Sequence, residues 1–160
     1  MRPLNTVEQA AVSARRAQFD AFYSELMPVL VGFIDRLGIT PAHAVLTDAV
    51  AFAPLVSAAL RDMRVETADD RVWLVTRVGY FVGEYLVQNH GGCWFVNDDP
   101  DSATFARFVV GRFAALGGSQ ARVDPFAVAA DYTDGLPGAD FAALLADIDV
   151  ALVGVGERAR

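Results

Sequence analysis

The sequence contains no lysine, a single cysteine, Cys93, and only two histidines, His43 and His90. Its 13 basic residues are therefore all arginines, and 20 acidic residues bring the net charge to −7 at pH 7. This charge argues against sequence-independent binding of nucleic acid, which needs a basic face. One cysteine excludes a disulfide within the chain and is typical of a protein of the reducing cytoplasm.

Long apolar runs are also missing. The richest segment, AVAFAPLVSAAL at residues 49–60, has 12 residues and contains a proline, whereas a membrane-spanning helix needs about 18 or more apolar residues. The N-terminal MRPLNTVEQ shows no apolar signal-peptide region. We therefore expect a cytoplasmic protein that does not associate with a membrane.

The apolar content is nevertheless high, with 54% hydrophobic residues and a mean hydropathy of +0.32. At 160 residues, without repeats or a linker, the chain should form one globular domain over residues 1–160. Large exposed apolar patches are uncommon on monomers. The surplus therefore favours a protein partner or a homodimer. A basic partner would suit the net charge best, but the favoured interpretation of the acidity is that it keeps the protein in solution.

Apolar residues recur at three- and four-residue steps over most of the chain, which predicts helices. The first pattern covers residues 6–37 and should kink or restart at Pro28, which lacks an N–H group. A second covers residues 41–63, with a break expected at Pro54. The C-terminal part should add two more helices: residues 125–132 and 139–153.

A third helix is predicted over residues 68–89, with Thr67 as its N-cap. Its polar side chains form only a narrow strip: Arg77, Glu84 and Gln88. A helix that is apolar nearly all round is expected to be the buried centre of the fold. Gly79 and Gly83, four residues apart, should allow another backbone to approach it closely.

A small antiparallel sheet should follow this helix. The glycines at 91–92 are expected to end the helix in a left-handed turn. CWFV at 93–96 predicts a strand, NDDPDS at 97–102 a turn, and residues 104–110 a second strand; residues 111–122 suit a third strand plus a loop. The fold class is therefore α+β: a mostly helical domain with a small antiparallel sheet or hairpin after the buried helix.

Three residues around the end of the central helix could carry chemistry. Cys93 and His90 are three residues apart, and a cysteine nucleophile needs a base to form its thiolate. Glu84, or an aspartate of the turn, could then orient the imidazole. These residues define one hypothesis, a small hydrolase or transferase. The favoured interpretation is a packed thiol, because free cysteine is among the most buried residue types.

Glu84 should either lie exposed along the polar strip or be held by an arginine and the nearby turn, since a buried carboxylate must be paired. The structural interpretation is favoured over a catalytic carboxylate. The NDDPDS turn offers oxygen ligands but lacks the pattern of an EF-hand loop, and two histidines are few for a transition-metal site. We expect no metal and no cofactor, and a solvated acidic turn.

The run GYFVGEYLVQNHGGCWFVNDDPDSATFARFVVG, followed by VDPFAVAADY, resembles small uncharacterised bacterial proteins in which a G-x-Y-x-G-E helix leads through Gly-Gly to an aromatic strand. Phe81 stands where tyrosine would be usual. The matching positions are Gly79, Phe81, Gly83, Glu84, Gly91, Gly92 and Trp94, with Asp124–Pro125–Phe126 as a second landmark. The resemblance covers residues 79–132 and implies no catalytic residues. It implies a similarity in size and context to cytoplasmic immunity proteins that neutralise secreted toxins.

The leading hypothesis is a non-catalytic, immunity-like protein-interaction module. No Gly-rich phosphate loop, GxSxG, HExxH or CxxC motif is present, and the acidic, apolar composition favours a protein partner. The partner-binding surface is predicted at the hairpin turn: Trp94, Asn97, Asp98, Asp99 and Asp101.

Overall fold

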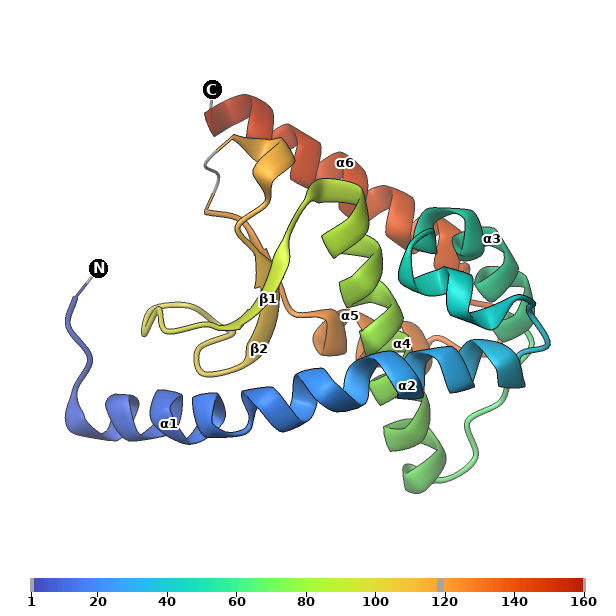
Figure 1. Ribbon diagram of the computed structural model, residues 1–160, viewed down its shortest axis with the longest axis horizontal. Coiled ribbons are helices and arrows are strands. Elements are labelled where there is room, and N and C mark those ends of the chain that lie inside the picture. The colour runs from blue at the N-terminus through green and yellow to red at the C-terminus, as the bar shows by residue number, and fades with distance from the viewer. Residues whose placement is uncertain (1, 118–119, 160) are drawn as a thin grey trace.

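One long helix, α4 (Ala68–His90), passes through the middle of the computed structural model, which describes residues 2–117 and 120–159 (Figure 1). Thr67 caps it by accepting the N–H of Asp70, and Gly91 ends it in a left-handed conformation with φ of 69°. All residues from Val78 to Leu86 are buried. The predicted buried central helix is confirmed.

The N-terminal helical pattern forms two helices, α1 (Thr6–Ala17) and α2 (Phe19–Arg36), which follow one edge of the molecule (Figure 1). The interruption lies at Gln18 and not at the predicted Pro28, which α2 accommodates. Proline removes one helical hydrogen bond, but Leu26 and Leu30 on either side are fully buried. Their packing holds the helix together across the proline.

The second predicted helix is divided into a 3-10 helix, η1 (Ala42–Leu46), and helix α3 (Ala49–Leu60). Gln88 of α4 stabilises the division, since its Oε1 accepts the Ala49 N–H at 2.7 Å and its Nε2 donates to the Val45 carbonyl at 3.0 Å. Pro54 lies within α3 and does not break it. The break was therefore predicted at the wrong residue, because the position of the break depends on the Gln88 side chain of another helix.

The sheet has three antiparallel strands in the order β1 (Cys93–Val96), β2 (Phe108–Gly111) and β3 (Arg122–Val123). The second strand begins four residues later than predicted, and the turn is a longer loop over residues 97–107. The predicted third strand is reduced to two residues and is preceded by a 3-10 helix, η2 (Ala114–Leu116). Two residues of that predicted segment, Gly118 and Ser119, lie outside the described residues.

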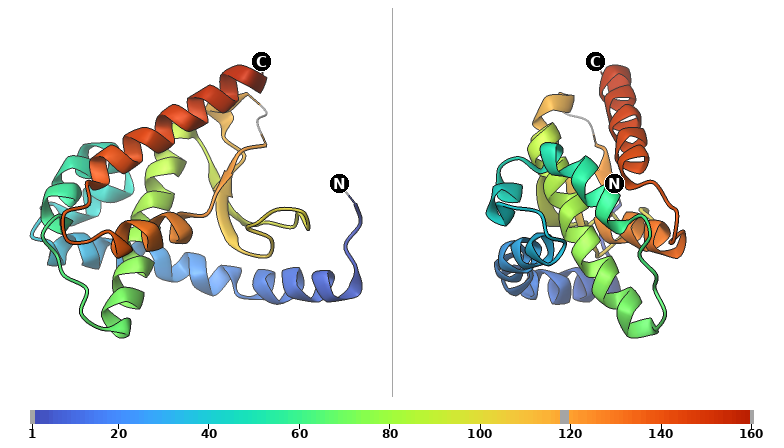
Figure 2. Two further views of the ribbon diagram at one scale, coloured as in Figure 1. Left: turned by 180° about the vertical axis from the view of Figure 1, so that it is seen from behind. Right: turned by 90° about the vertical axis from the view of Figure 1, so that its right-hand side faces the viewer.

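Two C-terminal helices complete the fold, which is a mostly helical α+β domain as predicted. Helix α5 (Pro125–Asp134) packs against α4, and α6 (Phe141–Ala159) crosses α3 and extends toward η2 (Figure 2). The Tyr132 and Phe141 rings, 4.9 Å apart between centroids, join the two helices in the core. Within the described residues, no helix combines the length and apolar character required to cross a membrane.

Candidate functional site

Trp94 and Glu84, both singled out from the sequence, form a buried pair. Trp94 of β1 packs onto α4 where Gly83 leaves room, and the indole Nε1 donates to Glu84 Oε1 at 3.1 Å. A Cβ atom on Gly83 would lie 2.7 Å from Trp94 Cε2 and closer still to two other ring atoms. Gly79 admits the Phe126 ring in the same way. The two glycines therefore accept aromatic rings rather than another backbone.

Glu84 is only 4% exposed, and no arginine contacts it in the described structure. Burial raises the pKa of its carboxyl group, and the hydrogen bond from Trp94 partly offsets that increase. Both predicted environments, an exposed strip and an arginine partner, are therefore wrong. Trp94 is itself 5% exposed, so it lies in the interior and not on a contact surface.

His90 pairs with the C-terminal helix. Its Nε2 lies 2.7 Å from Oδ1 of Asp149 on α6. The same Oδ1 accepts a hydrogen bond from Asn89 Nδ2 at 3.1 Å, and Oδ2 of Asp149 accepts one from Tyr85 Oη at 2.5 Å. Burial, followed by the bond to Asp149, raises the pKa of Tyr85 far above its usual range. Asp149 therefore ties the last two turns of α4 to α6, and Glu84 does not orient the imidazole.

Cys93 is exposed, which contradicts the predicted packed thiol. In β1 the buried positions are Trp94 and Val96, so the alternation of the strand directs Cys93 outward. Within the described part of the chain, no hydrogen bond joins Cys93 to His90. His90 instead contacts Asp149 and Glu84 contacts Trp94, so among the described residues no base is hydrogen-bonded to the thiol of Cys93.

The loop over residues 97–107 is organised by Asn97, which is fully buried. Its Nδ2 donates to Ser102 Oγ at 3.0 Å and to Thr104 Oγ1 at 2.9 Å, and its Oδ1 accepts from Arg122 at 2.9 Å. The backbone N–H of Asn97 also donates to the Arg107 carbonyl, which closes the loop. Asn97 is therefore a structural residue in the interior, not part of a solvated turn.

Each aspartate of the loop is paired with an arginine from another segment of the chain. The pairs are Asp98–Arg16 at 3.0 Å, Asp99–Arg122 at 2.8 Å and Asp101–Arg2 at 3.3 Å. The Arg122 guanidinium lowers the pKa of Asp99. Three positive charges thus accompany the three negative ones, and the loop is not the free acidic surface that its sequence indicated.

The described residues contain no group of three or more His, Cys, Asp and Glu side chains that could hold a metal ion. In the NDDPDS turn, Asn97 Oδ1 and both carboxylate oxygens of Asp99 accept hydrogen bonds from Arg122 and from backbone N–H groups of the loop.

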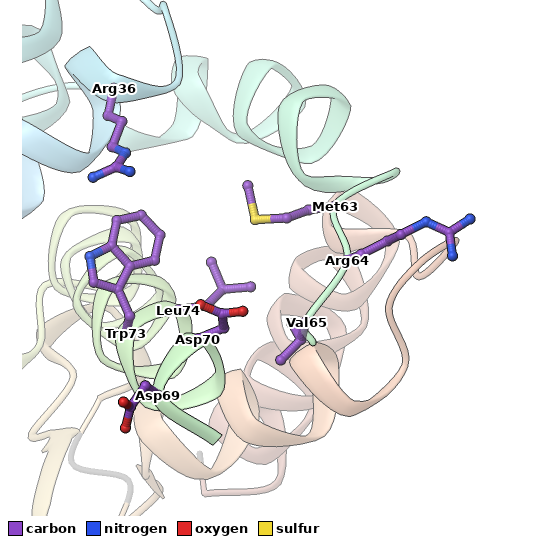
Figure 3. Close-up of a pocket in the computed structure, with 8 residues that line it drawn as sticks. All are labelled: Arg36, Met63, Arg64, Val65, Asp69, Asp70, Trp73 and Leu74. Atoms are coloured by element: carbon purple, nitrogen blue, oxygen red, sulfur yellow. The ribbon is translucent and has the colours of Figure 1, made fainter. Parts of the chain in front are cut away.

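A cavity of about 550 Å³ opens between the end of α2, the segment after α3 and the first turns of α4 (Figure 3). Trp73 forms one wall, with the guanidinium carbons of Arg36 and Arg77 at 5.0 and 4.4 Å from its ring centre. Met63 and Leu74 provide apolar surface, and the remaining lining residues are Arg64, Val65, Asp69 and Asp70. In Figure 3, Arg36 and Met63 point toward the cavity, whereas Arg64 points away from it.

Neither this cavity nor the role of Asp149 was predicted from the sequence. The spacing of Trp73 and Arg77, one helical turn apart, was a usable indication of their stacking. The contribution of Arg36 had no such indication, because α2 and α4 meet only in the folded chain.

Family models, curated proteins and solved structures give no match to this chain. The resemblance to small bacterial proteins of the immunity type therefore stays a prediction, and function must be argued from the geometry.

Proposed function

We propose that this chain is a non-catalytic, cytoplasmic protein-interaction module that neutralises a basic protein partner in the manner of an immunity protein. The observation that carries the proposal is an exposed acidic and apolar face on α2. Tyr23 and Met27, one helical turn apart, are 43% and 36% exposed. On monomers, exposed apolar residues that adjoin one another are typical of interaction sites.

This face continues into a groove of about 620 Å³ between α2 and η1. Met27 and Val31 of α2 and Leu46 of η1 provide apolar side chains, and Asp35 adds a carboxylate. We call the face and groove together the α2–η1 surface. Because it combines an apolar groove with acidic side chains, this surface suits an extended or helical segment of a partner protein.

The charges of α2 favour a basic partner. Asp20 and Asp35, on the same side of α2 as Met27, make no ion pair within the described structure, in contrast to the loop aspartates, which are neutralised by arginines. Unpaired carboxylates next to apolar side chains complement a segment rich in Lys or Arg. The α2–η1 surface therefore replaces the predicted Trp94 and Asn97–Asp101 surface in this proposal.

The enzyme hypothesis finds no support in the contacts of Cys93, His90 and Glu84. A nucleophile and its base must lie within hydrogen-bond reach, and among the described residues no hydrogen bond joins Cys93 to His90, whose Nε2 bonds Asp149. The exposed thiol is compatible with the reducing cytoplasm that the proposal assumes.

A photo-crosslinking experiment tests the proposal. A benzoylphenylalanine at position Met27, in cells of the source organism, should yield one dominant adduct with a different protein. The same group at Asp131, which is exposed on α5, a helix that carries no exposed large apolar residue, is the matched control and should yield no such adduct. Asp35→Arg should reduce the Met27 adduct, and the purified partner should lose activity when mixed with this chain.

Three outcomes would overturn the proposal. An adduct of twice the chain's mass would identify α2–η1 as the interface of a homodimer. Equal crosslinking at Met27 and Asp131, or none at either, would show that the surface selects no partner. A partner that retains full activity in the complex would refute neutralisation.

A further inference from the structure

The cavity beside Trp73 has fixed charges of opposite sign on different elements. Arg36 is the last residue of α2, whereas Asp70 lies in the first turn of α4, and both line the cavity. Neither forms an ion pair within the described structure. A volume of about 550 Å³ falls inside the range of about 300–1,000 Å³ that small-molecule sites occupy.

The positive side of the cavity is ordered by stacking. The Arg36 guanidinium lies over the Trp73 ring, and the Arg77 guanidinium, from the next turn of α4, stacks on the same indole ring. Arg77 also donates to the Trp73 carbonyl at 3.1 Å, which fixes it to its own helix. Arg36 thus keeps its N–H donors free for an anionic group, for which a planar guanidinium is well suited.

The negative side is Asp70. Its backbone N–H is held by Thr67 Oγ1 at 3.0 Å, which places the residue firmly in the first helical turn. Its carboxylate makes no hydrogen bond in the described part of the chain. The neighbouring Asp69 also lines the cavity, but its carboxylate points away from Trp73 and Arg36 in Figure 3.

Apolar side chains connect the two ends. Met63 directs its thioether toward the cavity, and Leu74 lies between Trp73 and Asp70 (Figure 3). An aromatic wall and a flexible thioether adapt readily to an apolar ligand.

We propose that this cavity binds a short zwitterionic molecule with an apolar body, such as an apolar dipeptide, with its carboxylate at Arg36 and its ammonium group at Asp70. The site is separate from the α2–η1 surface and does not depend on the function proposed for it. No covalent step is involved, so binding alone is the property to measure.

Calorimetric titration of the intact protein with the dipeptide Leu-Leu tests the site. The free dipeptide should bind, and capping either end should weaken binding about tenfold, since each cap removes one charge-assisted contact. N-acetyl-Leu-Leu lacks the ammonium group, and Leu-Leu-amide lacks the carboxylate. This comparison needs no protein variant and therefore no assumption about folding.

Matched variants of the protein then show which residue contacts each end of the dipeptide. Arg36→Gln should bind Leu-Leu and its amide equally, and Asp70→Asn should bind Leu-Leu and its acetylated form equally. Arg61→Gln and Asp62→Asn, which change exposed residues just before the lining segment and outside the cavity, should behave as the unaltered protein. Circular dichroism melting of all four variants confirms that they are folded.

The proposal fails if Leu-Leu does not bind at millimolar concentration or if neither cap changes its affinity. It also fails if Arg61→Gln has the same effect as Arg36→Gln, because the charge would then act at long range and not through a contact.

Discussion

The contact between Gly83 and Trp94 gives the sharpest prediction about this fold. Replacing Gly83 by alanine adds one methyl group on α4, directly beneath the indole ring. That methyl carbon would lie 2.7 Å from Trp94 Cε2 and closer to two further ring atoms. Real Cβ atoms do not approach this closely, so the buried ring has to move.

The expected cost combines opposing terms. Alanine is favoured over glycine within a helix by about 1 kcal/mol. Overpacking of a buried site costs about 1–3 kcal/mol. Displacement of the ring would also break the 3.1 Å hydrogen bond between Trp94 and Glu84, and a buried donor left without an acceptor costs about 1–3 kcal/mol. We expect Gly83→Ala to lower the free energy of unfolding by about 3 kcal/mol.

Urea unfolding followed by tryptophan fluorescence measures this change. Gly32→Ala is the matched control, because Gly32 lies inside α2 and a Cβ there would meet no atom within 4 Å. That variant should be stabilised, by up to about 1 kcal/mol.

A double-mutant cycle tests the cause. Trp94→Leu removes the ring atoms that the new methyl group would meet, so Gly83→Ala should cost almost nothing in that background. An equally large cost with leucine at position 94, or a Gly83→Ala protein as stable as the unaltered one, would refute the steric reasoning.

Three further predictions concern the residues around the end of α4. Burial raises the pKa of Glu84 above its ordinary 4.5. The folded chain therefore retains this proton to higher pH than the unfolded chain does. Stability is lost as the pH rises from 4.5 through the pKa of the folded state. Glu84→Gln, which keeps an acceptor for Trp94, should therefore gain stability relative to the unaltered protein across that interval, as measured by urea unfolding at a series of pH values. Asp149→Ala should lower the free energy of unfolding by about 1–3 kcal/mol, because it removes the acceptor of Tyr85 and leaves buried donors unpaired. Cys93 should react fully with a thiol reagent in the folded protein, since its side chain is exposed.

Each of these has a contrary outcome. A stability difference for Glu84→Gln that is independent of pH would mean that the carboxyl group titrates normally. An Asp149→Ala protein that unfolds at the same urea concentration would show that the contacts to α6 add nothing. Labelling of Cys93 only after denaturation would support the packed thiol predicted from the sequence. For Asp149→Ala the control is Asp147→Ala, which changes an exposed aspartate on the same helix.

The sequence by itself determined the elements whose causes are local. Thr67 and Gly91 mark the ends of α4 because capping and a left-handed turn involve only adjacent residues. The nearly uniform apolar character of that helix required a buried position, and the structure confirms it. The predominance of helices followed from the three- and four-residue apolar spacing, and the CWFV strand followed from the glycines before it and the turn-forming residues after it.

Only the tertiary structure decided what the polar residues do, because their partners are distant in the chain. Asp149 reaches His90 from α6, Arg122 and Arg16 neutralise the loop aspartates, and Gln88 divides the second helical segment. From the sequence alone, a charged side chain is expected to be free in solvent, because the residue that pairs with it in the folded chain is not known. The cavity beside Trp73 arises in the same way, since Arg36 of α2 and Asp70 of α4 line one cavity only after folding.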